Sequence, residues 1–99
     1  MLIPKLLPIP FAENGRKNTI PDNRTSEMQA HLASFDTGFP AITMLPKQDG
    51  GLPPDGMDMN GILYDLSVHA VYQNKGGQYK FDAEYAELIG GYPTGAILL

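Results

Sequence analysis

The sequence predicts a small α+β or irregular fold, with one long helix, one short helix and few short strands. Three observations predict this class. The 11 Gly and 9 Pro among 99 residues interrupt regular structure at close intervals. A hydrophobic share of 42% is too high for a disordered chain. Two stretches, about 58–74 and 82–89, begin at an aspartate and run into a glycine pair.

Residues 1–11 (MLIPKLLPIPF) are expected to form an extended apolar arm, followed by a single small domain over 12–99. Three prolines hold this arm in polyproline or edge-strand geometry and exclude a signal-peptide helix. No small-residue cleavage site follows, and the stretch is too short to span a bilayer. We expect the arm to lie on a surface of its own chain or of a neighbour through Ile3, Leu6, Leu7, Ile9 and Phe11.

Residues 12–55 are expected to be mostly loop. Asn14-Gly15 and Asp36-Thr37-Gly38 are turn sequences. The apolar run 41–45 predicts a short strand that stops at Pro46, and a second loop follows it. A further strand is expected to begin in the tail, YPTGAILL.

The long helix is expected to carry two apolar stripes. Asp58 is the expected N-cap, and Gly76-Gly77 supplies the left-handed residue that ends a helix. At 100° per residue, one stripe contains Met59, Ile62, Leu63, Leu66 and Ala70, and the opposite one contains Tyr64, Val68, Val71 and Tyr72. Two stripes imply two packing partners, so we expect the second stripe at an interface with a symmetry mate.

The short helix, about 82–89, has its own start and stop signals. Asp82 is the expected cap, Glu84 and Glu87 suit the early turns, and Gly90-Gly91 ends the helix.

Composition and spacing exclude several chemistries. The net charge of −4, with seven Lys plus Arg, argues against nucleic-acid binding. The chain has no Cys, so thiolate metal sites and cysteine nucleophiles are excluded. Aligning Gly61 with the glycine of a calcium loop places Gly56 and Ser67 at ligand positions that require acidic residues. We therefore predict no catalytic residue, no metal and no cofactor.

His69 has two neighbours in the sequence, Ser67 and Asp65, that could form a catalytic or metal-binding pair with it. Ser67 and His69 diverge by about 200° on a helix and cannot form a nucleophile–base pair. Asp65 and His69 are four residues apart and can meet, which more often indicates a surface hydrogen bond than half of a site.

Four blocks in order carry a resemblance: PFAENGRKNTIP, then GFPAITM, then GGLPPDGMDMNGIL, then IGGYPTGA. Together they resemble the N-terminal, virion-proximal region of bacteriophage and prophage tail fibre proteins, over about residues 8–98. The segment DNRTSEMQAHLA, 22–33, fits that pattern loosely, which leaves the geometry of the first loop open.

The resemblance implies a structural virion protein that attaches a fibre to the tail or baseplate. Such fibres are typically homotrimers, assembled in the cytoplasm of the host bacterium. The family pattern continues past the last block, so we expect host binding to lie outside residues 1–99. Two other classes stay open: a receptor- or glycan-binding module that uses the five tyrosines, and a hydrolase that uses His69 and Asp65.

Overall fold

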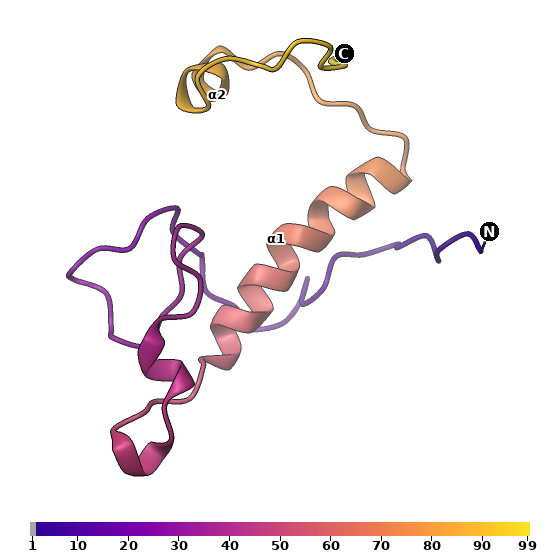
Figure 1. Cartoon of the computed structure of the whole chain (residues 1–99). Coiled ribbons are helices and arrows are strands. Elements are labelled where there is room, and N and C mark those ends of the chain that lie inside the picture. The colour runs from indigo at the N-terminus through magenta and orange to yellow at the C-terminus, as the bar shows by residue number, and fades with distance from the viewer. Residues whose placement is uncertain (1) are drawn as a thin grey trace.

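The computed structural model describes residues 2–99. Four helical elements follow one another: the 3-10 helices η1 (Ala41–Met44) and η2 (Lys47–Asp49), then α1 (Gly56–Asn74) and α2 (Ala83–Leu88). Long loops join them, and α1 forms the axis along which the other segments are arranged (Figure 1). The prediction of a small, mostly irregular fold with one long and one short helix is therefore confirmed.

The chain is extended and has little core. Its radius of gyration is 17.1 Å, against about 13 Å for a compact domain of 100 residues. Its accessible surface is 7785 Å², whereas a compact protein of 10.8 kDa exposes about 5,500 Å². Among the described residues, only Ile20, Ala33 and Val71 are buried hydrophobic side chains. The chain therefore exposes about 2,300 Å² more surface than a compact chain of the same mass, which would bury that area within itself.

The long helix begins two residues earlier than expected, because Asp55 rather than Asp58 is its N-cap. The Asp55 carboxylate accepts hydrogen bonds from the amides of Met57 (2.8 Å) and Asp58 (3.3 Å). Pro53-Pro54 keeps the chain extended just before this cap. The expectation that Asp58 caps the helix was wrong, because its carboxylate is engaged by residues of the first loop.

Both helices end at their glycine pairs, as predicted. In α1 the amide of Gly77 donates to the Tyr72 carbonyl and that of Gly76 to the Gln73 carbonyl. In α2 the corresponding bonds run from Gly91 to Ala86 and from Gly90 to Glu87. The first glycine of each pair has a positive φ, 88° and 77°. This pair of bonds is the Schellman motif, which requires a left-handed residue that glycine adopts without steric cost.

The strand expectations were wrong. Residues 41–44 form η1, because the Thr43 amide and hydroxyl both donate to the Pro40 carbonyl and close a tight turn. The tail also lacks a strand, and the only bridge within residues 2–99 joins Ser34 and Gly38 around the predicted turn. A strand needs a neighbouring strand for its backbone bonds, and none of the described segments runs beside these two for long enough.

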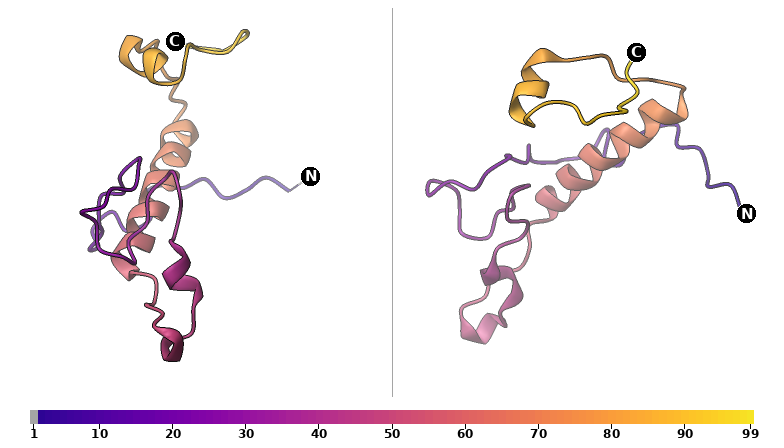
Figure 2. Two further views of the ribbon diagram at one scale, coloured as in Figure 1. Left: turned by 60° about the vertical axis from the view of Figure 1, so that its left-hand side comes forward. Right: turned by 45° about the horizontal axis from the view of Figure 1, so that its top comes forward.

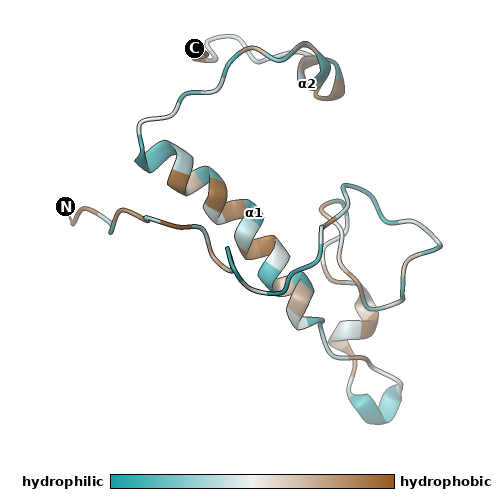
Figure 3. Ribbon diagram, turned by 180° about the vertical axis from the view of Figure 1, so that it is seen from behind, coloured by the Kyte–Doolittle hydropathy of each residue, from teal (hydrophilic) through white to brown (hydrophobic). Residues whose placement is uncertain are grey.

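The inner part of the arm, residues 7–11, lies along α1 and runs antiparallel to it (Figure 1). The Leu7 amide donates to the Asn74 side chain (2.6 Å), and the Phe11 amide donates to the Ser67 hydroxyl (2.7 Å). Figure 3 shows apolar residues in the arm and on successive turns of α1. A turn at residues 11–14 then directs the chain into the first loop.

Candidate functional site

A polar hub joins the first loop to the start of α1. At its centre Asp58, which is 2% exposed, accepts a hydrogen bond from the Asn18 side-chain amide (2.8 Å) and one from the Ala33 backbone amide (2.7 Å). The backbone amide of Asn18 donates to the Met57 carbonyl (3.0 Å). We call Asn18, Ile20, Ala33, Asp58 and Gly61 the hub.

Gly61 allows the loop to approach the helix. A Cβ at this position would overlap the backbone carbonyl of Asn18 and press on the side chain of Ile20. One residue earlier, the Asn60 side chain donates to the Arg16 carbonyl (2.9 Å). The hub therefore holds three segments, near residues 16–20, 33–34 and 57–61, with bonds across 25 to 44 positions of sequence.

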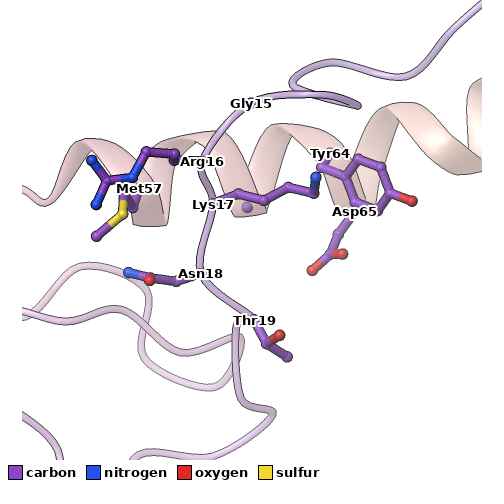
Figure 4. Close-up of a pocket in the computed structure, with 9 residues that line it drawn as sticks. Gly15, Arg16, Lys17, Asn18, Thr19, Met57, Tyr64 and Asp65 are labelled. Carbon is purple, nitrogen blue, oxygen red and sulfur yellow. The ribbon is translucent and has the colours of Figure 1, made fainter.

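A shallow hollow lies next to the hub, between residues 15–19 and α1 (Figure 4). Lys17 reaches across it, with its ammonium 4.6 Å from the centre of the Tyr64 ring. The same ammonium donates to the carbonyls of Ala12 (2.9 Å) and Glu13 (3.2 Å). Because Lys17 is occupied by its own chain, we read this hollow as a seam that closes the turn against the helix.

An apolar groove of about 390 Å³ separates the arm from α1, and Leu7, Ile9, Phe11, Leu63, Leu66 and Ser67 line it. Leu66, at 60% exposed, and the arm side chains Ile9 and Phe11 remain open to solvent. Two hydrogen bonds, from backbone amides of the arm to side chains of α1, thus hold the arm to the helix, and apolar packing contributes only in part.

An aromatic cleft of about 780 Å³ lies at the opposite end of the chain from η1 and η2, where residues 79–98 face the last turns of α1. Its lining includes His69, Tyr79, Phe81, Tyr85, Tyr92 and Leu98. His69 Nδ1 lies 2.7 Å from the Tyr79 hydroxyl, and the Phe81 and Tyr92 rings are tilted with centroids 5.3 Å apart. Tyr79, Phe81 and Tyr85 are exposed, so their rings are available to a ligand.

The residues expected at an interface fall into three settings. Ile3, Leu6, Ile9 and Phe11 are exposed on the arm, and Leu7 is half-buried. On the second stripe Val71 is 5% exposed, and Tyr64 and Val68 are half-buried. Tyr72 is more open, and its hydroxyl donates to the Gln78 carbonyl (2.8 Å). The interface role of these residues stays a prediction, since the structure contains one chain.

The residues weighed for chemistry are engaged elsewhere. His69 faces Tyr79, and Asp65 forms no hydrogen bond or ion pair within residues 2–99. Ser67 accepts from the arm, and its hydroxyl donates to the Tyr64 carbonyl (3.3 Å). Among the described residues, no group of three or more His, Asp or Glu side chains is arranged to hold a metal ion. No helix of this part of the chain is long and apolar enough to cross a membrane.

Comparison with known protein families gives no match to this chain, and comparison with curated protein sequences gives none either. The site must therefore be read from its own geometry.

The sequence reasoning missed the hub and the cleft. A signal for the hub was present, because Asn18, Ile20, Asp58 and Gly61 all belong to blocks that carry the family resemblance. The cleft had a weaker signal in its tyrosines, because their spacing does not predict that residues 69, 79 and 92 meet.

Proposed function

We propose that this chain is a structural virion protein, the tail-fibre domain that attaches a phage fibre to the tail or baseplate and supports its trimerisation. It assembles in the bacterial cytoplasm and acts by covering surface on partner proteins. The observation that carries this proposal is the excess of about 2,300 Å² of exposed surface, present on a chain whose hub is well bonded. Permanent protein complexes bury about 2,000 Å² or more.

The convergence of the resemblance-bearing blocks supports the same proposal. Asn18 comes from the first block, and Asp58 and Gly61 come from the third, yet they meet in one buried cluster. Ala33 lies just before the second block and donates to the same aspartate. A pattern that fits one folding unit is better explained by a shared domain than by scattered similarity.

Two measurements test the proposal. The solution mass of the chain, measured by light scattering over a wide concentration range, is expected to be that of a trimer. Immunogold labelling of phage particles that contain the chain, with an antibody against the exposed loop 44–50, is expected to mark the junction between the fibre and the tail or baseplate. Gold on the capsid or on the distal fibre tip would overturn the attachment role.

The aromatic cleft favours a second candidate, a small receptor- or glycan-binding module. Concave sites lined by aromatic side chains with a few polar groups are common ligand sites, and here Gln73, Lys80 and Asp82 accompany the rings. Direct binding of the purified chain to bacterial cell-surface polysaccharide, lost in Tyr85→Ser and kept in Tyr64→Ser, would support this candidate.

A further inference from the structure

We propose that the aromatic cleft of one chain receives the outer end of the apolar arm, residues 2–6, of a second copy. The inference rests on the proposed self-assembly and names the surfaces that would make it. It concerns two exposed parts of the same chain: the apolar outer end of the arm and the aromatic cleft.

The outer end of the arm is free. Leu2 and Ile3 are 95% and 87% exposed, and Leu6 is exposed as well. Residues 2–7 form no helix, strand or turn. The inner end is fixed by the bond from Leu7 to Asn74, and the segment before it leads away from α1 (Figures 1 and 2). Pro4 fixes one backbone dihedral angle of this segment, which reduces the entropy that is lost when the segment binds.

The cleft fits such a segment chemically. Pro4 lies at the centre of this apolar segment, and extended chains that contain proline dock in grooves lined by aromatic rings. The Tyr92 ring is tilted by 46° against Phe81 and by 51° against Tyr85, with centroid distances of 5.3 and 5.9 Å. The Phe81 ring is 63% exposed, and the cleft volume of about 780 Å³ is that of a site for several residues.

Charge adds to this fit. Lys5 is the only charged side chain in the arm. Lys80 and Asp82 both line the cleft, and Glu84 and Glu87 follow on α2, so residues 79–99 contain one Lys against three acidic side chains. A Lys5 ammonium that enters with the arm therefore meets a segment of opposite charge, which favours this orientation.

The geometry favours exchange between copies over a return to the same chain. The arm is bonded to the Ser67 and Asn74 side of α1, whereas His69 lines the cleft about 200° around the helix from Ser67. In the views of Figures 1 and 2 the end of the arm lies away from α2. A contact from arm to cleft joins two different surfaces, so it is heterologous. Copies related by successive rotations of 120° form a closed ring of three through such contacts.

The absence of Cys allows a direct test by cross-linking. A Leu6→Cys chain is mixed with a tagged Tyr85→Cys chain, and copper phenanthroline is added. We expect a disulfide between the two chains at a yield about tenfold above that of the control pair Met44→Cys and Tyr85→Cys. Met44 is an exposed residue of η1, in the loop remote from the cleft, and so matches the accessibility of Leu6.

Three outcomes would overturn the proposal. A yield equal to that of the control would mean that the arm and cleft do not meet. A disulfide that forms only within the double variant Leu6→Cys/Tyr85→Cys, and not between chains, would mean that the arm folds onto its own cleft. Protection of Tyr85→Cys by soluble cell-surface polysaccharide, without a cross-link to the arm, would assign the cleft to a glycan.

A charge reversal provides a second readout that does not depend on new thiols. Lys5→Glu is expected to weaken self-association about tenfold, whereas the matched control Lys47→Glu, in η2, leaves it unchanged. Equal behaviour of both variants contradicts the arm exchange. If the two variants behave alike, but the chain is trimeric and gold marks the junction between the fibre and the tail or baseplate, the proposed function stands and only the arm exchange is contradicted. Loss of the gold label with cross-linking intact contradicts the proposed function alone.

Discussion

The hub and the C-terminal segment, residues 75–99, are held in different ways. The hub joins distant segments through buried hydrogen bonds to Asp58, and a glycine at the point of contact keeps the backbones close. In the C-terminal segment tilted aromatic pairs contribute, and bonds such as that from Asp82 to the Tyr92 hydroxyl (3.2 Å) are exposed. Bonds in water contribute less than bonds in a dry site, because solvent competes for each partner.

This difference assigns different tasks to the two regions. The hub is complete within one chain, since every buried polar side-chain atom among residues 2–99 has a hydrogen-bond partner. The C-terminal segment and the arm leave large side chains in water, including Leu88, Ile97 and Ile3. The hub is therefore suited to shaping a single chain, and the exposed regions are suited to completion by a partner.

The sharpest way to break the hub is Gly61→Ala. The new Cβ overlaps the Asn18 carbonyl, so the loop must move away from α1. We expect the free energy of unfolding to fall by about 3 kcal/mol, measured by urea denaturation at fixed chain concentration. Gly56→Ala is the matched control, because a Cβ there has nothing within 4 Å. An unchanged midpoint for Gly61→Ala would contradict the close approach.

The second variant, Asp58→Asn, keeps the shape of the side chain and replaces one acceptor by a donor. Because both carboxylate oxygens accept from donors, one of those bonds is lost and two donors face each other. The expected loss is about 2 kcal/mol. Asp65→Asn, at a position without a hydrogen bond or ion pair in residues 2–99, should stay within about 0.5 kcal/mol of the parent. Similar losses in both variants would mean that Asp58 is not the centre of the hub.

A bond deletion at the aromatic end sharpens the comparison. Tyr79→Phe removes the hydroxyl partner of His69 Nδ1 and leaves the ring, which is tilted by 52° against His69, in place. Because this bond is exposed, we expect a loss of about 0.5 kcal/mol, measured in the same denaturation assay. A loss as large as that of Asp58→Asn would show that the two regions do not differ in the way described.

The smallest expected effect is a gain. Ala12 is the one described non-glycine residue with positive φ, 58°, held there by bonds from Gly15 and Lys17 to its carbonyl. Ala12→Gly relieves the left-handed strain and increases the freedom of the unfolded chain, for a net gain of about 0.5 kcal/mol. Ala86→Gly, inside α2, should lower stability by about 1 kcal/mol. A loss in both variants would contradict the strain at Ala12.

Local features of the fold could be predicted from the sequence. The glycine pairs ended both helices because only a left-handed residue completes the Schellman bonds, and Asp82 capped α2 through the amide of Tyr85. The turn at Asp36-Thr37-Gly38 also formed, with Gly38 at φ 68°. Each of these features depends on residues within six positions of one another.

The apolar run 41–45 shows where local reasoning ends. Its side chains suit a strand, yet Pro40 offers a carbonyl that Thr43 takes with two donors, and no second strand competes for the backbone. The start of α1 gives the same lesson, because Asp55 and Asp58 are both good caps by residue type. Asn18 and Ala33 decided between them by taking the Asp58 carboxylate.

The sequence by itself determined the helices, their glycine stops and the apolar arm. Only the tertiary structure decided which aspartate caps α1, that Gly61 is a point of close approach, and that residues 69–98 gather rings around one cleft. The physical reason is the range of the interactions. Backbone bonds within a turn depend on neighbouring residue types, whereas the hub and the cleft depend on distances between segments up to 44 residues apart.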